Sequence, residues 1–448
     1  MRPVRRAAAV LTLAATALVA PLPEGGGRIA LAQPLSGATI EASISQRFEA
    51  DSNYELDPDP AGTSFFSDTR FGFDMTSGTE TRTFRLGFDV GMRALWEADE
   101  DFEFTYANPG IGFARYEQEW ADATFDGYLR LAQRRLSVLS PLDVPGFEIP
   151  PTLPPDDLTE FDGTERRLDT GFDLALRTDA PSSYRLGFDY TNFDYSDIPA
   201  GDAESTAPRY QYTATALWTL RFAPVLSSAV LAEYDYGKAD NALENEIGVS
   251  ALDVGLIYEP SEVLQIATGL GYADRTRNNT IDGETVEIEH DRGPEARAGF
   301  VYDLPDFTLE ANARVTTAAP ETRWTGDFGL QYDLPRGELF ARGYRDYGGN
   351  NLGNEVLIYG ALFGLTRDIN TLSRVGLDLS ASNQIDQEES GAADLNQANL
   401  TARYVYDLTS NVSTTLGYRL RLREGDDDGS ATSNAVFWTI GRTFYGSP

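Results

Sequence analysis

The sequence predicts an all-β protein: a transmembrane, antiparallel, up-and-down β-barrel of 18 to 20 strands, even in number and without a plug domain. Long alternating segments, connections that are alternately long and short, and the lack of an amphipathic helix to cover a sheet all indicate it. In residues 209–222 the even positions are apolar or aromatic, and the odd positions are polar except Leu217. Aromatic residues at both ends of this apolar face are typical of a strand that crosses a bilayer.

The N-terminal segment, residues 1–32, predicts a secretory signal peptide. Arg2, Arg5 and Arg6 precede an apolar run over 7–20, and residues 30–32 (Ala-Leu-Ala) have the pattern of a cleavage site. The apolar run is too short to span a membrane as a helix. We therefore expect residues 33–448 to be exported and, because no linker divides them, to form one barrel domain.

Composition excludes several classes of site. The chain has no cysteine, which excludes disulfides and thiolate ligands, and its formal charge of −34 argues against a nucleic-acid partner. Acidic runs such as 97–101 and 424–428 lie between the alternating segments. They are typical of solvated loops, with cation bridging to lipopolysaccharide as the alternative, and none has the spacing of a calcium loop. We expect no cofactor and no bound metal.

Twenty alternating segments follow residue 33 in order. They begin near Thr39, Phe65, Thr81, Gly110, Thr124, Arg166, Tyr184, Pro208, Ser228, Val249, Leu264, Glu295, Phe307, Arg323, Glu338, Val356, Leu372, Asn399, Val412 and Ala435. Short connections such as 305–306 alternate with long ones such as 51–63 and 279–292. Outer-membrane barrels have short periplasmic turns and longer outer loops, so an even count predicts that both termini are periplasmic.

A repeated sequence marks the ends of three segments. Residues 302–305 (Tyr-Asp-Leu-Pro) recur at 332–335, and 406–408 repeat the first three residues. Each Tyr and Leu falls on the apolar face just before a short turn, which predicts an aromatic girdle. Closure is required because, in hydrocarbon, strands satisfy their backbone hydrogen bonds only in a closed sheet. The first segment begins soon after residue 33, which leaves no room for an N-terminal plug.

The polar faces are the candidate functional surface. In the segment 412–423 the apolar residues alternate with Arg419, Arg421 and Arg423, which predicts a ladder of arginines that points into the lumen. Other inward charges are Arg403, Arg85 with Asp89 and Arg93, Arg130 with Arg134, Arg374 with Asp378, and Arg314 with Glu310. Mixed charges predict ion pairs that hold the wall together. The ladder instead favours an acidic loop partner or an anion path.

The longest connection, 139–165, is a candidate constriction loop. Prolines stiffen it, and it carries Asp143, Asp156, Asp157, Glu160 and Asp162. Loops of this length are uncommon unless they are functional. It either folds into the lumen opposite the arginines or stands outside the barrel.

Catalysis is not indicated. The sole histidine, His290, is predicted to lie in a loop beside Glu287, Glu289 and Asp291. No Gly-x-Ser-x-Gly motif or metal-ligand cluster accompanies it. We therefore do not expect an enzyme.

The last 50 or so residues resemble a known family. A Tyr-x-Leu-Thr-x-Asn turn at 406–411 leads to Leu-Gly-Tyr at 416–418, and an Asn at 434 begins a final strand that ends in aromatic residues. This pattern resembles the β-barrel porin type 2 family. The resemblance implies an outer-membrane barrel, in some members encoded with polysaccharide export systems. Two departures are the residues that follow Phe444, and Arg442 on the outward face, where its long side chain can reach the interface.

Two functions follow as expectations. The first is a porin-like channel for passive passage of small hydrophilic solutes across the outer membrane. The alternative is a non-conducting or accessory barrel that serves surface polysaccharide export or envelope assembly. The expected partners are outer-membrane lipid and lipopolysaccharide, with small hydrophilic solutes or polysaccharide in the lumen. Inward faces rich in Arg, Asp, Gly and Thr favour the channel. Monomer and trimer both remain open.

Overall fold

The computed structural model describes residues 38–446 except 55, 57, 97–101, 107–109, 136–163, 179, 197–207, 241–243, 282–283, 320–321, 350–354, 387–394 and 426–428. The predicted signal peptide lies outside the described residues, and so does nearly all of the predicted constriction loop 139–165. Both therefore remain predictions.

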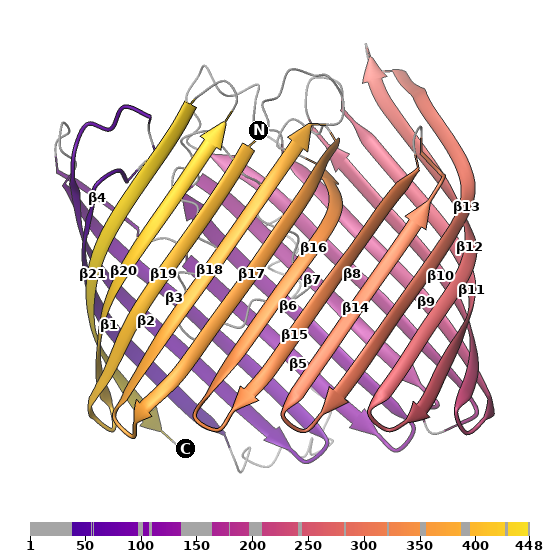
Figure 1. Ribbon diagram of the computed structural model, residues 1–448, viewed down its shortest axis with the longest axis horizontal. Coiled ribbons are helices and arrows are strands. Elements are labelled where there is room, and N and C mark those ends of the chain that lie inside the picture. The colour runs from indigo at the N-terminus through magenta and orange to yellow at the C-terminus, as the bar shows by residue number, and fades with distance from the viewer. Residues whose placement is uncertain are drawn as a thin grey trace, which may run out of the picture. The chain divides into compact units, whose positions relative to one another are not determined.

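Nearly all of the described chain is β-strand (Figure 1). The strands are β1 (Thr39–Asp51), β2 (Ser64–Thr79), β3 (Arg82–Trp96), β4 (Glu103–Tyr106), β5 (Gly110–Trp120), β6 (Ala123–Arg135), β7 (Thr164–Leu176), β8 (Ser182–Ser196), β9 (Arg209–Ala223), β10 (Leu226–Ala239), β11 (Glu246–Ser261), β12 (Leu264–Ile281), β13 (Glu284–Leu304), β14 (Phe307–Thr316), β15 (Arg323–Leu334), β16 (Gly337–Gly349), β17 (Glu355–Asn370), β18 (Ser373–Asp386), β19 (Leu395–Thr409), β20 (Val412–Gly425) and β21 (Gly429–Gly446).

The sheet closes on itself. Each long strand pairs antiparallel with the next one along the chain, and β1 pairs with β21 from Ile40↔Gly446 to Asp51↔Ala435. Among the described residues, twenty strands form the closed wall, and this confirms the all-β antiparallel barrel. The short β4 is an extra strand that pairs with the end of β3, beyond the stretch where β3 pairs with β5. No helix in the described part of the chain is long and apolar enough to cross a membrane.

The two ends of the barrel differ, as the alternating connection lengths predict. Tight turns join β2 to β3, β13 to β14, and β19 to β20 at one end, which is the lower end in Figure 1. The beginning of β1 and the end of β21 lie at this short-turn end, because Ile40 pairs with Gly446. The longer connections lie at the opposite end, called here the loop end.

Contacts between non-neighbouring strands identify the inner face. Arg297 on β13 reaches Glu233 on β10, and Arg419 on β20 reaches Asp51 on β1. Side chains from strands that are not adjacent converge only on the concave side of a closed wall, so the polar face is the inner one. Apolar residues of the opposite face, such as Leu416 (56% exposed) and Phe222 (57%), point outward. The predicted faces of β9 and β20 are therefore confirmed.

The repeated Tyr-Asp-Leu sequence takes the predicted place. Tyr302 and Tyr332 flank Phe307, with ring centroids 6.4 and 6.2 Å apart, on the outer face beside the short turns. Because aromatic rings favour a membrane–water interface, these contacts are consistent with a girdle at this level.

The sequence-based prediction of a long connection at 279–292 is wrong. Residues 279–292 are mostly strand, because β12 runs to Ile281 and β13 begins at Glu284. The resulting hairpin rises above its neighbours at the loop end (Figure 1). A shift in register between Arg277 and Asn278 interrupts the alternation, and acidic residues occupy both faces beyond it. Both features hide the strand from a period-of-two pattern.

Candidate functional site: the inner wall and an outer groove

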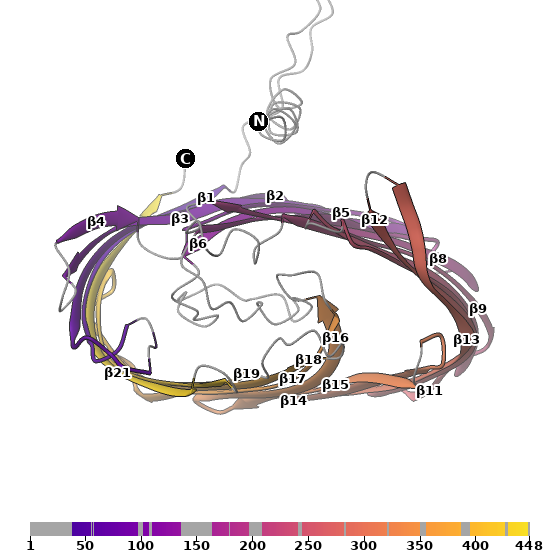
Figure 2. The ribbon, with the colours of Figure 1, turned by 90° about the horizontal axis from the view of Figure 1, so that it is seen from above.

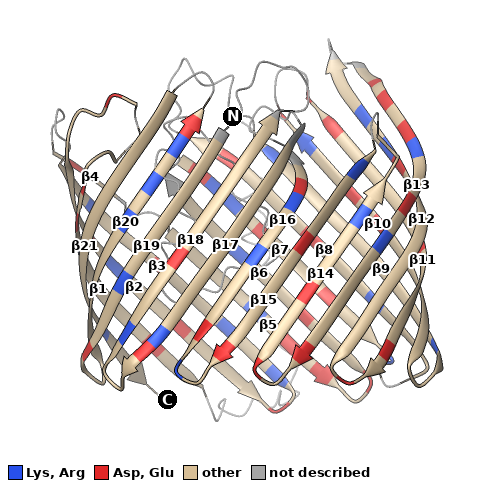
Figure 3. Ribbon diagram, in the orientation of Figure 1, with Lys and Arg blue, Asp and Glu red and all other residues tan. Residues whose placement is uncertain are grey.

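Ion pairs between neighbouring strands line the inner wall. Arg93 contacts Asp68 at 2.7 Å, Arg85 contacts Asp74 at 2.8 Å, and Arg185 contacts Asp173 at 2.6 Å. Figure 3 shows basic and acidic residues interspersed along many strands, with acidic residues frequent near the short turns. The wall therefore presents balanced charge to the lumen rather than a patch of one sign.

Inward charges that lie four residues apart on one strand do not pair with each other in the described part of the structure. Arg85 does not pair with Asp89, whose partner is Arg70. Arg314 pairs with Glu233 and Glu295 instead of Glu310, and Asp378 pairs with Arg403 instead of Arg374. The reason is geometric. Residues four apart on a strand are separated by about 13 Å, whereas diagonal neighbours on adjacent strands, such as Arg85 and Asp74, are about 7–8 Å apart.

The arginine ladder faces inward, but two of its members are buried. Arg419 is 3% exposed and contacts Glu49 and, at 3.4 Å, Asp51. Arg421 is 2% exposed, and its Nη2 donates to Asp51 Oδ2 at 2.9 Å. Both carboxylates belong to β1, so the pairs reach across β21 and span the seam where the barrel closes.

The residues after β1 complete this buried cluster. Arg421 Nη2 also donates to the backbone carbonyl oxygens of Asn53 (3.2 Å) and Tyr54 (2.8 Å). The Tyr54 hydroxyl accepts a hydrogen bond from Arg93 Nη1 at 2.9 Å, and its ring lies 4.4 Å from that of Phe66. Acidic residues thus do meet the ladder, but those in the structure come from β1. The predicted partner, 139–165, lies outside the described residues except for Thr164 and Glu165, which belong to β7.

The remaining predicted lumen residues have mixed surroundings. Arg423 is half-buried on the inner face, and Arg403 lies 3.2 Å from Asp378. Arg130 is half-buried on β6, with its backbone opposite Asp169. Arg134 occupies an inward position of the same strand, and its side chain lies outside the described part.

A second cluster joins strands across a bend of the wall. The carboxylate of Glu233 on β10 forms two ion pairs. Its Oε2 lies 2.8 Å from Arg297 Nη1 on β13, and its Oε1 lies 2.8 Å from Arg314 Nη1 on β14. Arg297 also lies 3.0 Å from Asp253, and Arg314 lies 2.8 Å from Glu295. Viewed from above, the wall is an oval that turns sharply near β9 to β13 (Figure 2). The alternation of polar and apolar residues predicts that Glu233 points inward. Its partners could not be predicted, because the curvature of the wall brings β13 and β14 close to β10.

Arginines also stack on inward aromatic rings. The guanidinium carbon atoms of Arg167 and Arg209 lie 5.1 and 4.4 Å from the centroid of Phe193, and that of Arg47 lies 4.0 Å from Phe437. Such contacts orient the guanidinium groups along the wall. They were not predicted, because the sequence does not show which rings lie opposite which arginines.

His290 lies on β13, so the predicted loop position is wrong. Its Nε2 is 3.0 Å from Asp274 Oδ1, and its Nδ1 is 3.5 Å from Glu287. The described residues contain no group of acids and histidine arranged to hold a metal ion. These contacts place His290 among acidic side chains of the β12–β13 hairpin.

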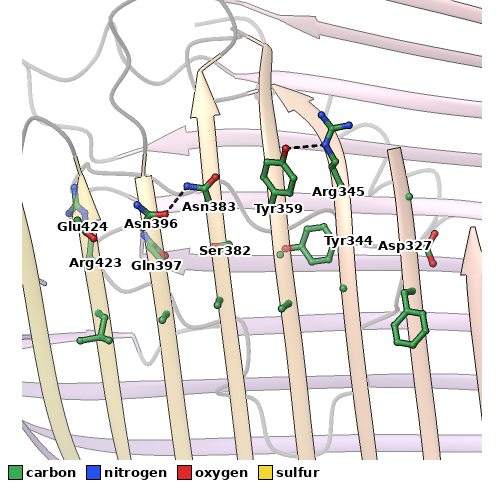
Figure 4. A pocket seen from close by; sticks show the side chains of 18 of the residues that line it. Asp327, Tyr344, Arg345, Tyr359, Ser382, Asn383, Asn396, Gln397, Arg423 and Glu424 are labelled. Atoms are coloured by element: carbon green, nitrogen blue, oxygen red, sulfur yellow. Dashed lines mark hydrogen bonds between the residues drawn. The ribbon is translucent and has the colours of Figure 1, made fainter. Parts of the chain in front are cut away.

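The outer face carries a groove of about 970 Å³ across β15 to β21 (Figure 4). Small outward residues form its floor, and Phe328 and Leu422 lie at its two ends. Its loop-end rim includes Trp324, Arg345 and Tyr359. No alternation pattern could have indicated this groove, because it depends on the register of several strands.

No protein-family model matches the chain, and no curated protein matches it. Among solved structures, the barrel is similar to the ferric-catecholate import receptor Fiu from E. coli K12, with 10% identity, a TM-score of 0.50, and coverage of 92% of this chain and 82% of that one. It is also similar to the ferric citrate transporter FecA, with 12% identity, a TM-score of 0.50, and coverage of 91% and 79%. OccAB2 of Acinetobacter baumannii aligns over 92% of this chain and 98% of its own, with 11% identity and a TM-score of 0.36. At these identities the likeness shows the fold alone: a large closed β-barrel.

Proposed function

We propose that the protein is an outer-membrane channel through which small hydrophilic solutes pass by diffusion. The observation that carries the proposal is the division of the wall into an outer face with exposed apolar residues and an inner face lined by ion pairs. Charged residues on a lipid-facing strand surface are costly, whereas a polar lumen is compatible with water. In this proposal the short turns and both strand termini face the periplasm.

The paired charges support weak rather than strong solute selectivity. Arg85, Arg93 and Arg185 each lie beside an aspartate, so the wall offers hydrogen-bonding groups with little net local charge. Conduction requires binding that is weak enough for the solute to leave. A wall of this kind suits small polar solutes of either charge.

The test is the conductance of the refolded protein, residues 33–448, in planar bilayers. We expect discrete current steps whose size grows with the salt concentration. An empty-bilayer control and a heat-unfolded sample should give no steps. Folded, inserted barrels that give no steps at 1 M potassium chloride would contradict the channel.

A second candidate is an accessory barrel of the cell envelope that conducts little. The observation in its favour is that ion pairs from non-adjacent strands cross the inner side of the wall at two places, around Glu233 and around Asp51. Such bridges narrow the space inside an oval barrel. The same bilayer measurement separates the two proposals, because this one requires inserted protein without current steps.

A further inference from the structure

The outer groove is built from one row of strand positions. Phe328, Gly343, Ala361, Ala381, Ala398 and Leu422 are consecutive partners on β15 to β20. The four central residues are small, and each end of the row is a large apolar side chain. The result is a trough that runs across the strands, with Phe328 and Leu422 at its two ends.

The next row toward the loop end is polar. It contains Arg345, Tyr359, Asn383, Asn396 and Glu424, again as consecutive partners on neighbouring strands. Asn383 Nδ2 donates to Asn396 Oδ1 at 2.7 Å, so one hydrogen bond links the two amides (Figure 4). The groove is therefore apolar along its floor and polar along one edge.

Arg345 is held at this edge by aromatic side chains. Its guanidinium carbon lies 3.8 Å from the Trp324 ring centroid and 5.4 Å from those of Tyr347 and Tyr359. Its Nε donates to the Tyr359 hydroxyl at 3.2 Å, and its Nη1 donates to the Trp324 carbonyl oxygen. The strands β15 and β16 are paired only as far as Gly326↔Arg345, so this side chain bridges the point where they part.

The charge of Arg345 is not balanced within the described residues. No carboxylate there lies within ion-pair distance of it, and its hydrogen-bond partners are neutral. Two other outward-facing cations of the loop end do have carboxylates: Lys238 contacts Glu246 at 3.1 Å, and Arg292 contacts Asp274 at 2.6 Å. A fixed cation above an apolar trough, with no carboxylate partner in the described part of the chain, is complementary to an amphiphile with an anionic head.

We infer that this groove binds a membrane lipid whose acyl chain lies in the trough and whose anionic phosphate head contacts Arg345. The inference rests on the proposed membrane location but not on conduction. A guanidinium group is suited to phosphate because it offers several donors in a fixed plane. Because the side chains of Ala361, Ala381 and Ala398 are small, they leave the volume that the lipid acyl chain would fill.

Quenching of Trp324 tests the inference. We would keep Trp324 as the only tryptophan, by replacing the other four with Phe, and refold the protein in vesicles that contain phosphatidylcholine and acyl-brominated lipid. Brominated phosphatidylglycerol should quench Trp324 with an apparent affinity about fivefold higher than brominated phosphatidylcholine, the factor for one basic group near an anionic lipid. Equal affinities would overturn the inference.

Two substitutions and one control separate the groove from a general attraction to charge. Arg345→Gln should bring the preference to about one, and Ala381→Phe, which fills the trough, should reduce it although Arg345 remains. A barrel that keeps only Trp438, an outward residue near the middle of β21 that does not line the groove, should show no preference. An unchanged preference in Ala381→Phe would refute the groove as the binding site.

A second measurement covers the case in which the single-tryptophan barrel does not fold. The unmodified protein is refolded in phosphatidylglycerol or in phosphatidylcholine vesicles, and its thermal unfolding midpoint is read from gel mobility. We expect a higher midpoint in phosphatidylglycerol for the unmodified protein and a smaller difference for Arg345→Gln. If the protein did not conduct but still had a higher unfolding midpoint in phosphatidylglycerol, the proposed channel would be contradicted and the proposed lipid site would not.

Discussion

Arg421 is enclosed by one carboxylate and two main-chain carbonyl groups. Asp51 supplies the negative charge, while Asn53 and Tyr54 supply the carbonyl oxygens. Ser433 donates its hydroxyl to Asp51 Oδ1 at 2.6 Å and completes the surroundings. Because the desolvation of an ion pair is costly, such a cluster is sensitive to loss of one partner.

We expect Arg421→Gln to lower the free energy of unfolding by about 3–5 kcal/mol, because buried Asp51 would lose its nearer cation and keep only Arg419, at 3.4 Å. Arg423→Gln, on the same face of β20, is the matched control and should cost less, because Arg423 is only half-buried. The measurement is urea unfolding of the refolded barrel, followed by tryptophan fluorescence. An equal loss of unfolding free energy in the two variants would show that the buried ion pair with Asp51 does not account for the effect of Arg421→Gln.

The direction of these arginines could be predicted from the sequence, but their partners could not. Alternation along β20 fixes the face of Arg419 and Arg421, because successive side chains of a strand point to opposite sides. Their acids, Glu49 and Asp51, lie some 370 residues away and are brought near only by closure of β1 on β21. Predicting them requires the register across the seam, which no local pattern contains.

At the scale of one element, β9 separates a lipid-facing and a lumen-facing set of residues. Ala216 and Trp218 point outward, and Thr215 points inward opposite Glu233 of β10. Ala216 is near the middle of the strand, where an outward charge would be furthest from either interface.

Ala216→Arg should therefore impair insertion, at a cost of roughly 2–4 kcal/mol for an arginine on the lipid face at mid-membrane. Thr215→Arg places the same charge at the adjacent residue, which faces inward opposite Glu233, and it should be tolerated. The folded fraction after refolding into vesicles, read from gel mobility, compares the two. If Thr215→Arg were the more damaging change, the assignment of faces would be wrong for this strand.

Strand positions were predictable where alternation is regular. β5 at Gly110, β14 at Phe307 and β20 at Val412 begin where the sequence predicts. β13 begins eleven residues before the predicted Glu295, because beyond the outer apolar band nothing requires one face to be apolar. β4 was missed because four residues are too few to show a period of two.

At the scale of the whole molecule, ion pairs hold the barrel at a sharp bend. Glu233 connects β10 with β13 and β14, although β11 and β12 lie between them along the wall. Backbone pairing alone fixes each strand only to its neighbours. The side chains of Glu233, Arg297 and Arg314 therefore add contacts that restrain the shape of the oval.

Removing this connection should loosen the bend. Glu233→Gln keeps the size of the side chain but loses the charge that meets two arginines, so we expect a destabilisation of about 1.5–3 kcal/mol, the range for hydrogen bonds to charged groups. Because the bridge crosses the inner side of the wall, single-channel conductance should also rise in the proposed channel. Glu310→Gln is the control, since Glu310 faces inward on β14 without an ion-pair partner among the described residues. A conductance change in Glu310→Gln as large as that in Glu233→Gln would mean that lost wall charge, rather than release of the bridge, governs the current.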